Sequence, residues 1–167
     1  FYCGLSGGIE AENVEGNLKL LVNSLENVNK SAINLQRVIL TQGGKYYGVQ
    51  IGPHKTPSVE TDPRHMPPNF YYDQEDYVKE LASENSWDYT LVRPEVMIGF
   101  SQNGGALTAL STFAIYAAIC AEMNVPLHYP GNQKSFEALN KYTDAEILGD
   151  FEVWVAEEKK LIMPLVP

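Results

Sequence analysis

The sequence lacks most of the short motifs by which a reaction type is recognised. Its 167 residues contain neither a His-Glu-x-x-His zinc motif nor a Gly-x-Gly-x-x-Gly dinucleotide fingerprint. The three histidines, His54, His65 and His128, form no pattern with metal-ligand spacing, so we predict no metal site. The sequence therefore gives no support for metal-dependent catalysis. It also contains no glycine-rich loop of the kind that binds the pyrophosphate of a dinucleotide.

Basic residues and cysteines are also scarce. Lys and Arg number 12 against 21 Asp and Glu, giving a net charge of −9. Such a surface repels phosphate backbones and anionic membranes, so neither nucleic acid nor a membrane is an expected partner. Cys3 and Cys120 lie far apart without metal-ligand spacing, which indicates free thiols in a reducing, cytoplasmic compartment. The sequence begins with Phe1 and shows no basic signal-peptide region, so we interpret it as a piece of a longer chain.

Apolar periodicity predicts a strand followed by a helix at the start of the chain. Residues 1–5 are mostly apolar, and after a glycine turn apolar residues recur in steps of four and three, as on one face of a helix. A second, buried strand is predicted over residues 35–42. The order strand, helix, strand is typical of an α/β fold with a parallel sheet. The helical face consists of Val14, Leu18, Leu21, Leu25 and Val28.

The middle of the chain contains two predicted loops, a helix and a strand. The glycine-rich residues 43–48 are predicted to form a short loop. Residues 52–68 are rich in Pro, His, Thr and Asp without periodicity, which predicts a long loop, and long loops in compact domains tend to be functional. A helix is predicted from about residue 71 to residues 83–86. A strand over residues 87–100, interrupted by Pro94, follows it.

The last third of the chain is predicted to be mainly helical. The long apolar run of residues 104–123 contains too many polar residues for a membrane span, so we expect a buried helix that lines a core or pocket. A turn at residues 126–132 and a final helix over residues 142–157, with Asp144 near its start, complete the prediction. No composition shift splits the chain into domains.

Two adjacent tyrosines stand at the head of the helix predicted after the long loop. Many oxidoreductases carry Tyr-x-x-x-Lys on a helix, because residues four apart share a face and an ammonium there stabilises a phenolate. Here Tyr71 is followed at that spacing by Glu75, and Tyr72 by Asp76. Either the chemistry differs, or the lysine comes from elsewhere. Lys45 follows a predicted strand, where parallel sheets build ligand sites, although most such lysines are simply solvated.

Several segments together closely resemble one family. They are "NVEGNLKLL" (13–21), "TQGGKYYG" (41–48), "NFYYDQED" (69–76), "RPEVMIGF" (93–100), "IYAAICAEMNVPLHYPG" (115–131) and "YTDAEIL" (142–148). They resemble the progesterone 5β-reductase and iridoid synthase-like branch of the extended short-chain dehydrogenases. The resemblance implies an α/β fold with an incomplete Rossmann-type parallel sheet. Residues 1–154 would form the C-terminal part of that domain, and residues 155–167 a divergent tail.

The resemblance also implies a reaction and its catalysts. The reaction is the NADPH-dependent 1,4-reduction of an enone or enal, with a small apolar carbonyl compound as substrate. In this family a lysine from the loop after an earlier strand takes the place of the helical lysine. Carried over, the catalytic residues are Lys45 and one tyrosine of the pair, with Tyr71 preferred and Tyr72 kept as the alternative. NADH stays open, because the residues that read the 2′-phosphate would lie outside this sequence.

Several of the implied cofactor-binding residues lie at or just after the ends of predicted strands. The others lie at the start of the helix predicted after the long loop and at the start of the long apolar helix. One departure is Thr41-Gln42-Gly43, where relatives usually read Gln-Thr-Gly. Because the pyrophosphate-gripping loop is also missing, a second hypothesis is a non-reducing protein: a binding module, an inactive fragment or a cofactor-free enolisation catalyst. A truncated sheet would expose an edge, which favours a homodimer. The implied contacts are Gly4, Leu5, Thr41, Tyr71, Met97, Gly104, Gly105 and Ala106.

Overall fold

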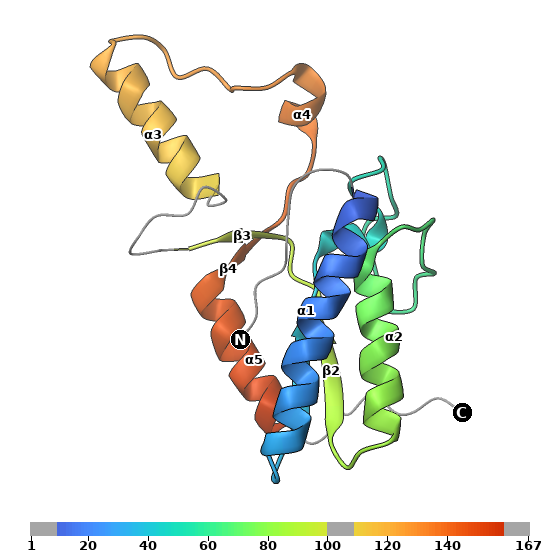
Figure 1. Cartoon of the computed structure of the whole chain (residues 1–167). Coiled ribbons are helices and arrows are strands. Elements are labelled where there is room, and N and C mark those ends of the chain that lie inside the picture. The colour runs from blue at the N-terminus through green and yellow to red at the C-terminus, as the bar shows by residue number, and fades with distance from the viewer. Residues whose placement is uncertain (1–9, 100–108, 159–167) are drawn as a thin grey trace. The chain divides into compact units, whose positions relative to one another are not determined.

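The computed structural model describes residues 10–99 and 109–158. It divides into two compact units, which are described separately. The first comprises the residues up to Arg93 together with those from Glu152 onward, and the second comprises Pro94–Phe151. Figure 1 shows the helices and strands of both units, and most of them are labelled. The strand predicted over residues 1–5 lies outside the described residues.

The first helix, α1, spans Glu10–Ser31. Its apolar stripe is the one predicted, and Leu21 and Leu25 are buried in the core. Val28 departs from the prediction, because it is 44% exposed near the end of the helix.

A two-stranded parallel sheet forms the centre of the first unit. Strand β1 spans Arg37–Thr41 and strand β2 spans Asp88–Val92, in register from Arg37 opposite Asp88 to Thr41 opposite Val92. The Gln42 amide continues the ladder by donating to the Val92 carbonyl at 2.7 Å. The α/β class and the parallel pairing are therefore confirmed. With two strands in each sheet of the described residues, the Rossmann-type sheet is incomplete, as predicted.

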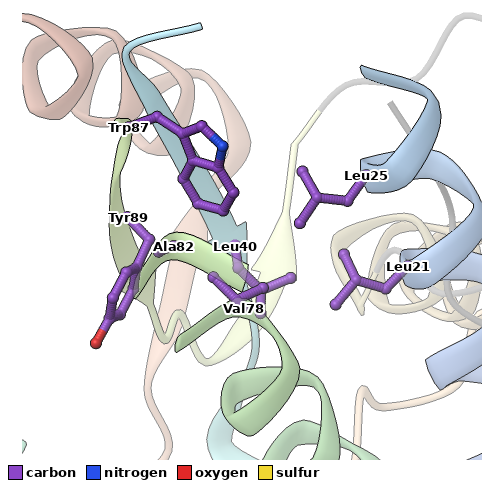
Figure 2. Packing of buried hydrophobic residues seen from close by; sticks show 7 residues of the cluster. All are labelled: Leu21, Leu25, Leu40, Val78, Ala82, Trp87 and Tyr89. Carbon is purple, nitrogen blue, oxygen red and sulfur yellow. The ribbon is translucent and has the colours of Figure 1, made fainter. Parts of the chain in front are cut away.

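Helix α2, Phe70–Ser83, packs beside α1 and completes the core of the first unit. Its bounds agree closely with the predicted helix. Figure 2 shows the cluster that joins the two helices to the sheet. The Trp87 indole at its edge donates to Asn29 of α1 at 2.8 Å, so its polar atom is satisfied. The cluster consists of Leu21, Leu25, Leu40, Val78, Ala82, Trp87 and Tyr89.

Helix α5 spans Ala145–Glu157, and a side chain forms hydrogen bonds with the backbone near each of its ends. The Asp144 carboxylate accepts from the amides of Glu146 at 3.0 Å and Ile147 at 3.1 Å, as its place in the sequence suggested. Near the other end, Arg37 of β1 donates to the carbonyls of Val155 and Glu158. A cation there complements the negative end of the helix dipole, so Arg37 anchors this part of α5 to the first unit.

The interruption that was predicted at Pro94, within the strand over residues 87–100, is confirmed. Pro94, which has no amide hydrogen to donate, ends the first segment, and a separate strand β3 follows at Val96–Ile98. β3 pairs in parallel with the short strand β4, Tyr142–Asp144. The sequence analysis missed β4 and the five-residue helix α4, Gln133–Glu137. Both are too short to show a periodic pattern.

Helix α3, Ala109–Glu122, contradicts the prediction of a buried helix. Leu110, Phe113 and Ile119 are exposed in this chain, whereas Cys120 is buried as a free thiol. The helix is mostly apolar and packs against β3, a three-residue strand that is too small to cover it. Across residues 10–99 and 109–158, the helices are all too short or too polar to cross a bilayer.

Candidate active site at the carboxyl end of the parallel strands

Strand β1 leads directly into the turn that carries Lys45. Residues 44–47 form a 3₁₀ helix, η1 (Gly44–Tyr47), which corrects the predicted irregular loop. The turn closes at Gly48, whose φ of 84° lies in the left-handed region that favours glycine. Tyr46 points into the unit and is buried, whereas Lys45 is exposed. The carboxyl end of β1 therefore presents an ammonium group at the surface.

One buried side chain connects this turn to the tyrosine pair. Asn69 is the N-cap of α2, and its Oδ1 accepts from the Tyr71 amide at 3.1 Å. Its Nδ2 donates to the Lys45 carbonyl at 2.8 Å. Tyr71 is half-buried, with its ring against Phe70 at a centroid distance of 4.4 Å. The backbones of Lys45 and Tyr71 are thus joined through a single amide group.

Tyr72 has a different environment from Tyr71. Its ring is buried, and its hydroxyl donates to the Tyr46 carbonyl at 2.7 Å and accepts from the His65 amide at 3.0 Å. Burial raises the pKa of Tyr72, and the opposing effect of the His65 amide is smaller. This hydroxyl holds the turn and the long loop together inside the unit.

Gln42 joins β1, α2 and Arg93. Its side chain is buried, and Nε2 donates to the Tyr71 carbonyl at 2.9 Å. Its Oε1 accepts from Arg93 Nε, also at 2.9 Å. The Arg93 guanidinium lies 3.5 Å from the centre of the Tyr46 ring, a cation–π contact. The sequence Thr41-Gln42-Gly43 differs from the Gln-Thr-Gly usual in the family that it resembles. It places a glutamine under the first turn of α2, where its side chain holds the structure together.

Glu75, four residues after Tyr71, occupies a cluster of positive charge. Its carboxylate lies 3.2 Å from Arg93, 3.5 Å from Arg64 and 2.5 Å from Lys79, while its side chain is only 5% exposed. A buried carboxylate requires such compensation. The position that holds lysine in Tyr-x-x-x-Lys therefore holds the acceptor of a buried ion-pair cluster.

The long loop predicted over residues 52–68 is confirmed, since residues 48–69 contain neither helix nor strand. Its C-terminal part is fixed to the site. Arg64 makes a two-point contact with Asp76, at 2.8 and 2.7 Å. The His65 ring lies with Nε2 3.0 Å from the Lys45 carbonyl and Nδ1 2.8 Å from the Met66 carbonyl.

The predicted cofactor contacts are only partly within the described structure. Thr41 ends β1 and is exposed, and its hydroxyl donates to the Glu152 carboxylate. Met97 lies in β3 of the second unit, 37% exposed. Gly4, Leu5, Gly104, Gly105 and Ala106 lie outside the described residues.

The described part of the site fits a nicotinamide cofactor in one respect. Thr41, η1 and the start of α2 all lie at the carboxyl end of parallel strands, where open α/β sheets bind dinucleotides. Residues 10–99 and 109–158 contain no group of three His, Cys, Asp or Glu side chains suited to a metal ion.

Sequence analysis missed four residues that build this site: Gln42, Glu75, Arg93 and His65. Only Glu75 gave a signal in the sequence, because an acidic residue on a largely apolar helical face predicts a buried partner of opposite charge. Gln42 and His65 each contact a backbone carbonyl of a distant segment, and sequence patterns carry no such information.

This combination of parallel strands, crossover helices and a site after β1 defines a Rossmann-type α/β domain. Residues 1–161 match the family described as the PRISE-like Rossmann-fold domain. The chain belongs to that family.

Three relatives illustrate the similarity. The short chain dehydrogenase gsfE of Penicillium aethiopicum is 33% identical, covering 89% of this chain and 40% of the relative. The (S)-8-oxocitronellyl enol synthase of Catharanthus roseus is 34% identical, covering 91% and 40%. The 3-oxo-Delta(4,5)-steroid 5-beta-reductase of Arabidopsis thaliana is 33% identical, covering 88% and 39%. The chain spans about two fifths of the length of these relatives.

Proposed function

We propose that this protein is an NADPH-dependent reductase of an activated C=C bond, in an enone or enal, and that Lys45 and Tyr71 are its catalytic residues. Family membership and relatives named as a dehydrogenase and a steroid 5-beta-reductase support the class of reaction. The observation that carries the assignment is the Asn69 bridge between the backbones of Lys45 and Tyr71. A small apolar carbonyl compound is the proposed substrate.

The environments of the two tyrosines favour Tyr71 as the catalyst. The Tyr72 hydroxyl already makes two hydrogen bonds to the backbone, and its ring is 7% exposed. A phenol that must turn toward a substrate carbonyl would have to give up these contacts. Tyr71 is half-buried in the first turn of α2, so part of its side chain is accessible to a substrate.

The chemistry assigned to this chain is stabilisation of negative charge on a carbonyl oxygen. When bound, the cofactor supplies hydride to the β-carbon of the substrate. The Tyr71 hydroxyl donates a hydrogen bond to the substrate oxygen as charge builds there, and the Lys45 ammonium stabilises the same charge. The compensation of Glu75 by Arg93 keeps an unpaired carboxylate away from the developing enolate.

The experiment is NADPH consumption with a simple enone, combined with calorimetric titration of NADPH into the folded chain. We expect Tyr71→Phe and Lys45→Ala each to lower kcat by roughly 10²-fold or more. Matched controls are Tyr77→Phe on the same helix and Lys55→Ala in the long loop, which should retain the activity. NADH is tested in parallel, because the choice of nucleotide is part of the proposal.

Two results would count against this function. Equal loss of activity in Tyr77→Phe and Tyr71→Phe would remove the assignment of the tyrosine. A folded chain that binds neither nucleotide would favour the alternative, a non-reducing binding module or cofactor-free enolisation catalyst, and proton exchange of a ketone substrate would then separate these two. Light scattering of the same samples tests the proposed homodimer.

A further inference from the structure

Lys45 and Tyr71 belong to segments separated by a long loop, so helical geometry cannot fix their distance. In a Tyr-x-x-x-Lys helix the backbone alone sets that spacing. Here a tertiary contact must do so. We propose that Asn69 is a positioning residue that sets Lys45 against Tyr71; this inference rests on the proposed function.

The orientation of the Asn69 amide follows from its partners. The Tyr71 amide is a donor, so the oxygen that faces it at 3.1 Å must be Oδ1. The Lys45 carbonyl is an acceptor, so Nδ2 must face it, at 2.8 Å. Nδ2 also lies 3.1 Å from His65 Nε2. Nε2 of His65 also lies 3.0 Å from the Lys45 carbonyl, so Asn69 and His65 both face this oxygen.

The helix alone does not require asparagine at this position. Asp and Ser cap helices about as well, because each offers an oxygen to the first amides. Neither, however, offers a donor to the Lys45 carbonyl. An ionised Asp has no hydrogen to donate, and a Ser side chain that caps the helix is too short to reach the carbonyl as well. Asn69 is also only 1% exposed, so its donor is not replaced by bulk water. The requirement for an amide therefore comes from Lys45 and not from α2.

A single substitution of Asn69 can therefore separate its contact with Lys45 from its role as the N-cap of α2. Asn69→Asp keeps the oxygen that caps α2 and removes the donor to Lys45. Asn69→Ser does the same without adding charge. The matched control is Asn132→Asp, because Asn132 caps α4 in the second unit by accepting from the Ser135 amide at 2.9 Å.

The first readout is independent of activity. NMR of the ¹³C,¹⁵N-labelled chain follows the Lys45 carbonyl shift and the hydrogen exchange of the Gly48 amide, which donates to that carbonyl at 3.2 Å. In Asn69→Asp and Asn69→Ser we expect the Lys45 carbonyl resonance to move and Gly48 exchange to accelerate about tenfold or more, with amides in the middle of α2 unchanged. Asn132→Asp should leave Lys45 and Gly48 as in the wild type.

The second readout is enone reduction, with kcat and KM measured separately. We expect kcat to fall roughly 10- to 100-fold in both Asn69 variants, because a displaced catalytic group costs about this much. NADPH affinity should change less than about twofold. A folded variant with wild-type kcat, or with an unchanged Lys45 carbonyl, would overturn the inference. If the wild type is inactive and the Lys45 signals still move, the proposed reaction fails while the positioning of Lys45 by Asn69 stands.

Discussion

The Arg93 guanidinium lies 3.2 Å from the Glu75 carboxylate, and the two side chains are only 10% and 5% exposed. Arg93 directly follows β2 and Glu75 lies in the second turn of α2, so the pair fixes the sheet to the helix. Arg93 also donates to Gln42 and stacks on Tyr46. Removing one partner leaves the other charge buried without compensation.

We therefore expect Glu75→Ala to lower the free energy of unfolding by about 3 kcal/mol or more. Glu80→Ala, at an exposed position on the same helix, should change it by less than about 0.5 kcal/mol. Urea denaturation followed by fluorescence of the buried Trp87 measures both. A loss below about 1 kcal/mol for Glu75→Ala would mean that this ion pair contributes little to the fold.

Two tyrosines on α2 should respond oppositely to removal of the hydroxyl. Tyr72→Phe removes hydrogen bonds to the Tyr46 carbonyl and from the His65 amide, at a cost of about 1–3 kcal/mol. The buried Tyr77 hydroxyl has no hydrogen-bond partner within the described part of the chain, so Tyr77→Phe should be neutral or stabilising. Equal destabilisation of both variants in urea would contradict this account.

Stability should fall at alkaline pH. Burial raises the pKa of Tyr72, Tyr77 and Tyr89 above their ordinary value of 10.0. Above that value the unfolded chain releases these protons while the folded chain keeps them, so the free energy of unfolding decreases as pH rises. Denaturation between about pH 9 and 11 measures the slope, and Tyr72→Phe should make it shallower. An identical slope in wild type and variant would exclude Tyr72 as a contributor.

At acid pH the two-point contact between Arg64 and Asp76 should matter. Hydrogen bonds from Arg64 hold the pKa of Asp76 below its ordinary value of 3.8. The stabilisation is fully present above that value and is lost as the pH falls through the lower, folded-state pKa. Because the Asp76 side chain is 60% exposed, we expect at most about 1 kcal/mol. Asp76→Asn and Arg64→Gln should remove the same acid-dependent part, although Arg64→Gln also loses the contact with Glu75. A coupling energy of zero in the double-mutant cycle at neutral pH would contradict the pairing.

Gly48 and Gly149 should respond oppositely to alanine. Gly48 has a φ of 84°, and a Cβ there would lie 3.1 Å from Cδ2 of His65, so Gly48→Ala should cost about 1–2 kcal/mol. Gly149 is an exposed position in α5 with nothing within 4 Å of an added Cβ, and alanine should stabilise it by about 0.5–1 kcal/mol. Thermal melting of both variants tests the difference in sign.

The sequence was sufficient to predict the elements that repeat a periodic pattern. The apolar stripe through Leu21 and Leu25 predicted α1, and the end of the aperiodic residues 52–68 marked the start of α2. Strand β3 lies within the strand predicted over residues 87–100. The sequence was not sufficient for β4, whose three residues are shorter than any recognisable alternation and lie within the predicted final helix. It misjudged α3, because an apolar composition predicts burial only when other elements are present to cover the helix.

The candidate site was predicted less completely than the fold. Lys45 and the tyrosine pair were located through a resemblance, and their catalytic roles stay predictions. The groups that hold them are polar contacts across the fold, such as Gln42 to the Tyr71 carbonyl and Asn69 to the Lys45 carbonyl. Each depends on one hydrogen bond between distant segments, and no spacing in the sequence encodes it.

The attachment of the long loop near Arg64 and His65 has a consequence for how such a site diversifies. These two residues hold the end of the loop next to α2, whereas residues 49–61 precede the anchors. Surface loops accept insertions at a small entropic cost. Residues 49–61 can therefore change in length and composition between proteins that share an ancestor, while the residues of the site held by Arg64 and His65 keep their positions.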